Sequence, residues 1–258
     1  MTGPTKARPT LARMAASAGL ALAATAPAQA ATTVYEAILD DLSGLGGSGR
    51  ADIVHDGMDN TLWVRIQGGG FAADQLHVQH IHGRFDDDGN PRDSVSPTLA
   101  DDTDGDGVIE LLEGLPRYGG ILLSLFDEDE AGNAFDGFPS ASNGIIDFTH
   151  TFDLDSTAAL SDGVTAADLF PLELREIVVH GAFLEPGIGG IGNEQPGNDL
   201  LENGGYSAFV PVAAGEIRLS RSQVDPRMDP PAVPLPPAGF ALMAGVAGLG
   251  ALRARRKA

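Results

Sequence analysis

The sequence predicts an all-β domain, an antiparallel Greek-key-like sandwich with a calcium-loop insert. Three observations favour this class. Short segments with alternating apolar and polar residues recur along the chain, Gly, Asp and Asn bound most of them, and only two segments have a helical pattern. Many short strands separated by turns are typical of antiparallel sandwiches and barrels. With 258 residues, the chain is long enough to bury a sizeable core.

The predicted strands follow one another at 34–39, 51–54, 61–66, 75–82, 145–154, 173–181 and 210–219. The two helical segments are 108–115 and 165–169. Two long inserts, about 84–144 and about 182–208, interrupt the series of strands. Because loops of this length are usually functional or held in place by a ligand, we expect a site in at least one of them.

The first 30 residues have the pattern of an export signal. Three basic residues precede an apolar run over 14–26, and Ala28-Gln29-Ala30 forms a small-residue cleavage site. We therefore expect a signal peptide over 1–30 that is removed after Ala30. The alternatives are an amphipathic helix and a membrane-spanning helix, and spanning the bilayer requires about 20 apolar residues, which is more than this run contains.

The other end of the chain resembles a bacterial sorting signal. Val233-Pro234-Leu235-Pro236 precedes an apolar run over 238–252, and the chain closes on the basic sequence RARRKA. This arrangement is similar to the VPLPA-CTERM signals of Gram-negative bacteria, which an exosortase-type membrane peptidase is thought to recognise and cleave. Because Pro237 is inserted in the motif, the cleavage position stays open.

The resemblance implies a short transmembrane helix that anchors the chain transiently, followed by release or display at the cell surface. A buried C-terminal core helix is the alternative interpretation. The expected organisation is a signal peptide (1–30), a β domain (31–221), a linker (222–232) and the sorting signal (233–258).

Charge and cysteine content limit the classes of partner. Between residues 31 and 232 there are 36 acidic and 9 basic residues, an excess of 27 negative charges. Such a surface repels nucleic acid and anionic lipid and attracts divalent cations. The chain contains no cysteine, so an exported domain cannot use disulfides, and a metal is another way to hold its loops.

The first insert contains a calcium-loop pattern over 102–113. Counted from Asp102, acidic residues occupy positions 1, 3, 5, 9 and 12, and glycine occupies position 6. Alternating carboxylates can converge on one hard cation, and the last glutamate can bind it with both oxygens. The predicted calcium ligands are Asp102, Asp104, Asp106, Val108, Glu110 and Glu113. The alternative is a solvated acidic turn, and the segment before the loop lacks the pattern of an entering helix.

Three of the six histidines lie in the sequence HVQHIHG, residues 77–83. On a strand, His80 and His82 point to the same face and His77 to the other. His180 closes a later predicted strand and can meet them only through the fold. Imidazoles on neighbouring strands are common copper or zinc ligands, and they are also common hydrogen-bonded core residues. Both interpretations stay open for His80, His82 and His180.

Two stretches resemble the chordin-type (CHRD) domain family. Val78-Gln79-His80-Ile81-His82-Gly83 is similar to its HIHG element, and 211–218 (PVAAGEIR) is similar to its closing strand. The resemblance covers about residues 33–220 and implies an exported all-β domain, with no enzymatic activity attached to the family. The sandwich we expect is accordingly superoxide-dismutase-like or immunoglobulin-like.

A second resemblance is to copper-zinc superoxide dismutase, in which an H-x-H strand and a later VVH strand bring histidines to copper. His80, His82 and His180 match these three positions. The chain departs from that family in lacking a bridging histidine between Gly83 and His150, the disulfide cysteines and the arginine that guides superoxide. Its acidic field also opposes an anionic substrate.

From the sequence we expect an exported, surface-associated, non-catalytic structural or adhesive module of a Gram-negative bacterium, stabilised by calcium and processed by an exosortase-type peptidase. The alternative is a copper-binding, superoxide-dismutase-like metalloprotein. Nucleic acid is not an expected partner, and the extracellular partner is open.

Overall fold

The structure is a computed structural model that describes residues 32–129, 135–190 and 203–228. The signal peptide predicted over 1–30, the sorting signal predicted over 233–258 and the end of the expected linker lie outside the described residues. Within the described part of the chain, no helix has both the length and the apolar character needed to cross a membrane.

The described chain is mostly β. Its strands are β1 (Thr33–Asp41), β2 (Ser48–Asp56), β3 (Thr61–Gly69), β4 (Gln79–Phe85), β5 (Pro91–Arg92), β6 (Gly120–Ser124), β7 (Ile145–Asp153), β8 (Arg175–Leu184), β9 (Gly205–Glu216) and β10 (Arg218–Leu219). One α-helix, α1 (Leu111–Tyr118), and two 3₁₀ turns, η1 (Ala166–Leu169) and η2 (Leu172–Leu174), complete the regular elements.

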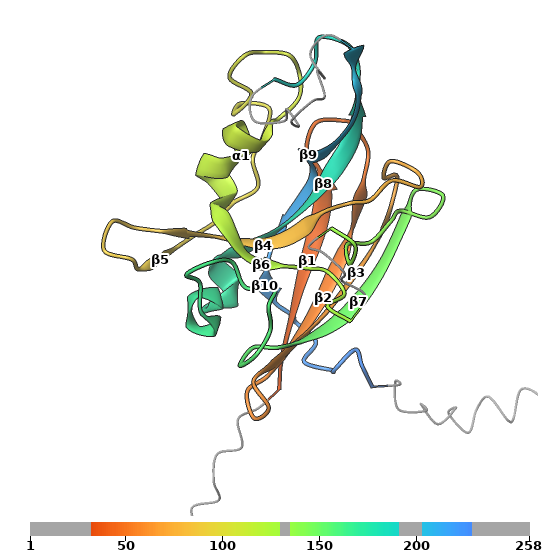
Figure 1. Ribbon diagram of the computed structural model, residues 1–258. Coiled ribbons are helices and arrows are strands. Elements are labelled where there is room, and N and C mark those ends of the chain that lie inside the picture. The colour runs from red at the N-terminus through yellow and green to blue at the C-terminus, as the bar shows by residue number, and fades with distance from the viewer. Residues whose placement is uncertain (1–31, 130–134, 191–202, 229–258) are drawn as a thin grey trace, which may run out of the picture.

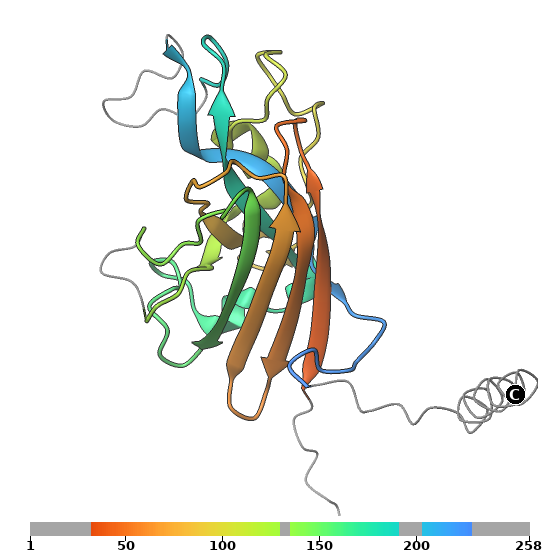
Figure 2. The same ribbon diagram turned by 90° about the vertical axis from the view of Figure 1, so that its right-hand side faces the viewer.

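All ten strands belong to one antiparallel sheet with the order β5-β4-β8-β9-β1-β2-β3-β7, while β10 pairs with β1 and β6 with β4. The order brings together strands that are far apart in the chain, such as β4 with β8 and β3 with β7. Figures 1 and 2 show the consequence: β1, β2, β3 and β7 form one side of the molecule, and β4, β8 and β9 cross behind them. The coarser prediction, a mostly β fold with an antiparallel sheet, is confirmed, and the Greek-key-like sandwich stays a prediction.

The alternation of side chains explains why the first half of the sheet forms. In β3, Leu62, Val64 and Ile66 are fully buried, whereas the residues between them are partly exposed. These side chains join one core with inward-facing residues of β4 and β8, among them Ile81 and Ile177. Fully burying one such aliphatic side chain contributes about 1.5–3 kcal/mol, so this core dominates the stability of the fold.

Strand β8 differs because both of its faces are buried. Ile177 and Val179 face the main core, and Val178, on the opposite face, packs in a second cluster with Tyr118 of α1 and Ala214 of β9. Helix α1 therefore covers the outer face of the β4–β8–β9 half of the sheet (Figure 1). This second, smaller cluster lies beside the candidate site described below.

The structure corrects several element boundaries. The first insert contains β5, α1 and β6, and β6 adds to the sheet beside β4. The predicted strand 75–82 begins only at Gln79, because Leu76 makes an isolated bridge to Ser140 instead. The helix predicted over 108–115 begins three residues later, because Glu110 is its N-cap and forms a capping box with Glu113.

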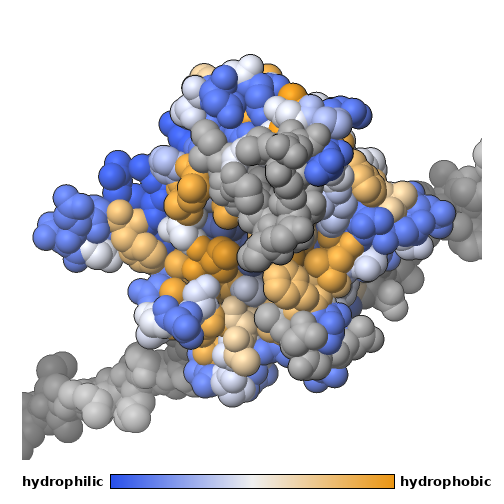
Figure 3. Space-filling view, turned by 45° about the horizontal axis from the view of Figure 1, so that its top comes forward, coloured by the Kyte–Doolittle hydropathy of each residue, from blue (hydrophilic) through white to orange (hydrophobic). Residues whose placement is uncertain are grey.

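The surface reflects the composition of the chain. In Figure 3, hydrophilic residues occupy most of the periphery of the face shown, and apolar residues gather towards its middle. Acidic side chains dominate the charged residues, as the sequence predicts.

Candidate metal centres

Three histidines converge on the outer face of the sheet, beneath α1. His80 and His82 lie two residues apart on β4, and His180 lies on the neighbouring strand β8. Their exposed fractions are 8%, 1% and 2%. The ring centroids of His80 lie 5.4 Å from those of both His82 and His180. One ring nitrogen from each of the three lies within 4.8 Å of the others. We call this group the histidine triad.

Backbone carbonyls fix the tautomer of two members of the triad. His82 Nδ1 donates to the carbonyl oxygen of Gly119 at 2.9 Å, and His180 Nδ1 donates to that of Phe209 at 2.7 Å. Because a carbonyl only accepts, each Nδ1 carries the proton and each Nε2 keeps a free lone pair. Metal-binding histidines are typically oriented through the second ring nitrogen in this way.

Three other ring nitrogens, one from each member of the triad, have no hydrogen-bond partner. These atoms are His80 Nδ1, His82 Nε2 and His180 Nε2, and all three are buried. The three rings approach one another without forming a hydrogen bond between them. Most buried polar atoms in proteins are paired, so three unpaired nitrogens in one place call for an explanation.

Burial keeps the triad neutral. Desolvation, together with the neighbouring imidazoles, lowers the pKa of His80 well below its ordinary value and that of His82 to about 3. Desolvation also lowers the pKa of His180 to about 4. The lone pairs are therefore available at neutral pH, which is the state that a metal requires.

The geometry fits a transition metal. With metal–nitrogen bonds of about 2.0–2.1 Å, tetrahedral ligand nitrogens lie about 3.4 Å apart, so the triad reaches this spacing by small side-chain movements. Neutral imidazole suits copper and zinc. The coarser prediction of candidate metal sites at these histidines and at the acidic loop is thus confirmed.

Helix α1 and the residue after it hold His82 in place. Tyr118 is fully buried and its ring lies 4.7 Å from that of His82. Gly119 has φ of +87°, and a Cβ atom there would lie 2.1 Å from the carbonyl oxygen of Gly83. Only glycine can therefore place this carbonyl against His82 Nδ1. Sequence reasoning missed Tyr118 and Gly119, although a glycine directly after a helix is a recognisable signal.

None of the other three histidines joins the triad. The ring nitrogens of His77, which the sequence places on the opposite face, lie 2.8 Å from the carbonyl oxygen of His180 and 3.1 Å from that of Ala72, and the neutral ring donates to one of the two. His55 packs on Phe170, and His150 lies on β7 near Asp127 and Glu128. The triad therefore contains three of the six histidines of the chain.

The predicted calcium loop forms a second candidate centre. Its carboxylates make two overlapping groups, one of Asp102, Asp104 and Glu113 and one of Asp104, Asp106 and Glu110, each with ligand atoms within 4.8 Å of one another. Gly107, at position 6 of the pattern, has φ of +93°. No helix enters the loop within residues 94–101. A role for the carbonyl of Val108 stays a prediction.

Glu110 is the least satisfied acid of the loop. It is fully buried, and no N–H or O–H group donates to its Oε2. Burial, the hydrogen bond to Glu113 and the nearby charges of Asp106 and Glu113 raise the pKa of Glu110 to about 9. Its carboxyl group therefore keeps a proton at neutral pH unless a cation offsets the neighbouring charges.

The acidic loop is tied to two other parts of the chain. Asp106 Oδ2 accepts a hydrogen bond from the N–H of Gly189 at 2.5 Å, and Glu110 Oε1 accepts one from the N–H of Gly190 at 3.2 Å. The N–H of Ile109 donates to Ser43 Oγ at 3.1 Å. The loop thus joins the turn after β1 to the segment after β8, which sequence reasoning did not anticipate.

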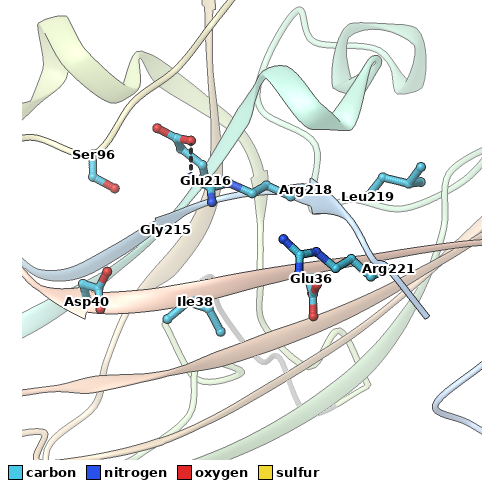
Figure 4. Close-up of a pocket in the computed structure, with 9 residues that line it drawn as sticks. All are labelled: Glu36, Ile38, Asp40, Ser96, Gly215, Glu216, Arg218, Leu219 and Arg221. Atoms are coloured by element: carbon cyan, nitrogen blue, oxygen red, sulfur yellow. Dashed lines mark hydrogen bonds and ion pairs between the residues drawn. The ribbon is translucent and has the colours of Figure 1, made fainter. Parts of the chain in front are cut away.

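A separate cavity of about 550 Å³ lies where β9 diverges from β1 (Figure 4). Arg218 pairs there with Glu216 at 2.8 Å, and Ser96 donates a hydrogen bond to the buried Glu176 behind it. Desolvation raises the pKa of Glu176 to about 8. Among the described residues, no group of possible metal ligands gathers at this cavity, so we do not count the cavity as a candidate metal centre.

No protein-family model matches the chain, and no curated protein matches it. The resemblances to the chordin-type domain and to copper-zinc superoxide dismutase therefore stay predictions.

Proposed function

We propose that the domain binds one copper ion through His80, His82 and His180. The observation that carries this proposal is the convergence of three buried ring nitrogens that have no hydrogen-bond partner. A buried polar atom without a partner costs about 1–3 kcal/mol. A purely structural cluster would pay this cost three times, whereas a bound metal accepts one lone pair from each neutral imidazole.

The donor set favours copper over other metals. All three donors are neutral imidazoles, and divalent affinities generally rise to copper and fall again at zinc. The excess of acidic residues draws cations towards the domain and opposes the approach of anions. We therefore propose binding of copper, with zinc as the competing ion, rather than dismutation of superoxide.

A second proposal concerns the acidic loop. The buried, unpartnered Oε2 of Glu110 and the two groups of carboxylates support calcium binding by Asp102, Asp104, Asp106, Val108, Glu110 and Glu113. Calcium there braces the loop against the turn after β1 and the segment after β8. Extracellular calcium sites with dissociation constants of about 10⁻⁴–10⁻³ M are common.

The wider setting is proposed from the sequence. We infer an exported chordin-type domain, delivered to the surface of a Gram-negative bacterium through an exosortase-type peptidase, with a superoxide-dismutase-like or immunoglobulin-like Greek-key sandwich. The non-sequential neighbours β4–β8, β9–β1 and β3–β7 support such a topology. A non-catalytic structural or adhesive role at the surface is the second candidate function, and the proposed calcium brace favours it.

Metal titration of the purified, metal-free protein tests the copper proposal. We expect one equivalent of Cu²⁺ per chain, nitrogen hyperfine coupling in the electron paramagnetic resonance spectrum, and loss of both in His82→Ala and His180→Ala. His150→Ala, a histidine outside the triad, is the matched control and should bind as the wild type does. If the wild type binds no copper, or if the triad variants bind it equally well, the proposal fails.

A further inference from the structure

An apolar chamber adjoins the histidine triad. It has a volume of about 330 Å³, and two members of the triad, His80 and His180, form part of its wall. The other described residues that line it are Val78, Leu111, Ile121, Ser124, Phe126, Phe135, Phe138 and Phe209. Apart from the histidines, Ser124 supplies the only polar side chain among them, and none carries a charge.

The rings of the chamber lie close enough to form an aromatic surface. Phe138 lies 5.6 Å from His80 and 5.5 Å from Phe126, both measured between ring centroids. Phe135 lies 6.4 Å from Phe138 and is 49% exposed, and Ile121 is 38% exposed. These last two side chains mark the side on which the chamber opens to solvent.

The chemistry of the wall selects the kind of occupant. An ion that enters an apolar space loses its hydration without gaining a charged partner, which costs several kcal/mol. An uncharged ring gains free energy from the same surface, and offset or edge-to-face contacts with aromatic side chains add about 0.5–1.5 kcal/mol each. An apolar cavity of about 150 Å³ holds benzene, so this chamber has room for one or two fused rings.

The triad supplies the second, independent indication of a ligand. His80 is 8% exposed and His180 is 2% exposed, and each has a ring nitrogen without a partner although the residue lines the chamber. Because these nitrogens are themselves buried, an occupant whose rings pack against the phenylalanines reaches them with its polar atom once the imidazole rings turn towards the chamber.

We propose that this chamber binds a small, uncharged aromatic molecule that carries one nitrogen or oxygen donor, with that donor directed to the triad. The part of the inference that concerns coordination rests on the proposed function, since the donor then completes the coordination of the metal. Binding of the rings themselves does not require the metal.

Benzimidazole is a suitable probe, because it is uncharged at pH 8, has two fused rings and presents one lone pair. Calorimetric titration into the metal-free full-length protein measures binding to the chamber. The visible and electron paramagnetic resonance spectra of the Cu²⁺ form then report coordination. Azide, a small anionic ligand of copper, serves as the comparison. We expect benzimidazole to bind the Cu²⁺ form at least tenfold more tightly than azide.

A matched pair of variants locates the binding. Ile121→Trp places a large ring at the opening of the chamber, whereas Ile145→Trp makes the same change at an exposed isoleucine of β7 outside it. We expect Ile121→Trp to keep copper binding and to weaken benzimidazole at least tenfold, while Ile145→Trp leaves both unchanged.

The outcomes separate the two proposals. If copper does not bind but benzimidazole binds the metal-free protein and Ile121→Trp weakens it, the metal proposal fails and the chamber stands. Three results would each overturn the chamber proposal. The protein binds copper but not benzimidazole, it binds azide more tightly than benzimidazole, or Ile121→Trp leaves the affinity for benzimidazole unchanged.

Discussion

Replacing His80 by leucine should stabilise the metal-free protein and destabilise the metal-bound one. His80 Nδ1 is buried without a partner, and its ring lies against Phe138 in an apolar wall. Removing an unpaired buried polar atom recovers about 1–3 kcal/mol, and a swap of similar volume costs less than about 1.5 kcal/mol in packing. We therefore expect the free energy of unfolding of metal-free His80→Leu to exceed that of the wild type by about 1 kcal/mol.

When metal is added, the wild type should become more stable than His80→Leu. A ligand present at 100 times its dissociation constant stabilises the folded state by about 2.7 kcal/mol, and only the wild type has the complete triad. Urea unfolding with and without Zn²⁺, which avoids copper redox chemistry, measures both values. The wild type should then exceed His80→Leu by about 2 kcal/mol, because the metal increment outweighs the metal-free difference.

His55→Leu is the matched control, because His55 Nε2 is also buried without a partner but lies away from the triad. Zn²⁺ should raise the free energy of unfolding of His55→Leu by the same amount as that of the wild type. The reasoning is refuted if His80→Leu destabilises the metal-free protein by 2 kcal/mol or more and Zn²⁺ leaves the wild type unchanged. The triad would then be a structural cluster.

Three further predictions concern the acidic loop, the helix and a buried carboxyl group. Excess chelator should lower the melting temperature of the calcium-loaded protein by several degrees, and Glu113→Gln should abolish this response in differential scanning calorimetry; an unchanged melting temperature would reject the calcium brace. Helix α1 begins at the acidic loop and ends at the carbonyl that holds His82. Glu113→Gln should therefore also weaken Cu²⁺ binding severalfold relative to an Asp129→Asn control. Equal affinities of the two variants for Cu²⁺ would show that the acidic loop does not influence the triad. Burial raises the pKa of Glu176 to about 8, so the folded state keeps a proton that the unfolded chain releases above its ordinary value of about 4.3. The contribution of this proton to the free energy of unfolding is complete below about pH 4.3 and is lost as the pH rises to about 8, by at most about 1.4 kcal/mol per pH unit. In urea unfolding, Glu176→Gln should make the free energy of unfolding less dependent on pH over this range. Parallel pH profiles of the variant and the wild type would contradict the raised pKa of Glu176.

The strands could be predicted where one face is buried and the other is not. In β1 and β3, alternation of apolar residues follows directly from the two faces of the sheet. Strand β6 escaped prediction because GILLS is a short run without alternation that directly follows a helix. The pairing of β4 with β8 was not predicted, since neither strand indicates its neighbour, and the resemblance to superoxide dismutase matched only the three histidines.

The candidate centres were predictable to different extents. The spacing of Asp102, Asp104 and Asp106 identifies the acidic loop, because its ligands are consecutive in the chain. The H-x-H spacing places His80 and His82 on one face, but their role depends on backbone carbonyls of Gly119 and Phe209. Backbone groups carry no signature in a sequence, so the orientation of the imidazoles required the structure.

The position of the triad, on the outer face of β4 and β8, bears on how the protein matures. Apolar contacts surround the triad, with Phe138 of the main core against His80 and Tyr118 of the smaller cluster against His82, so the chain can acquire its architecture before any ion arrives. For the export proposed above, we expect the chain to cross the membrane in an extended, ion-free form and to be loaded outside the cytosol. The metal content of the mature protein would then report the ions available in its surroundings and not those of the compartment where it was synthesised.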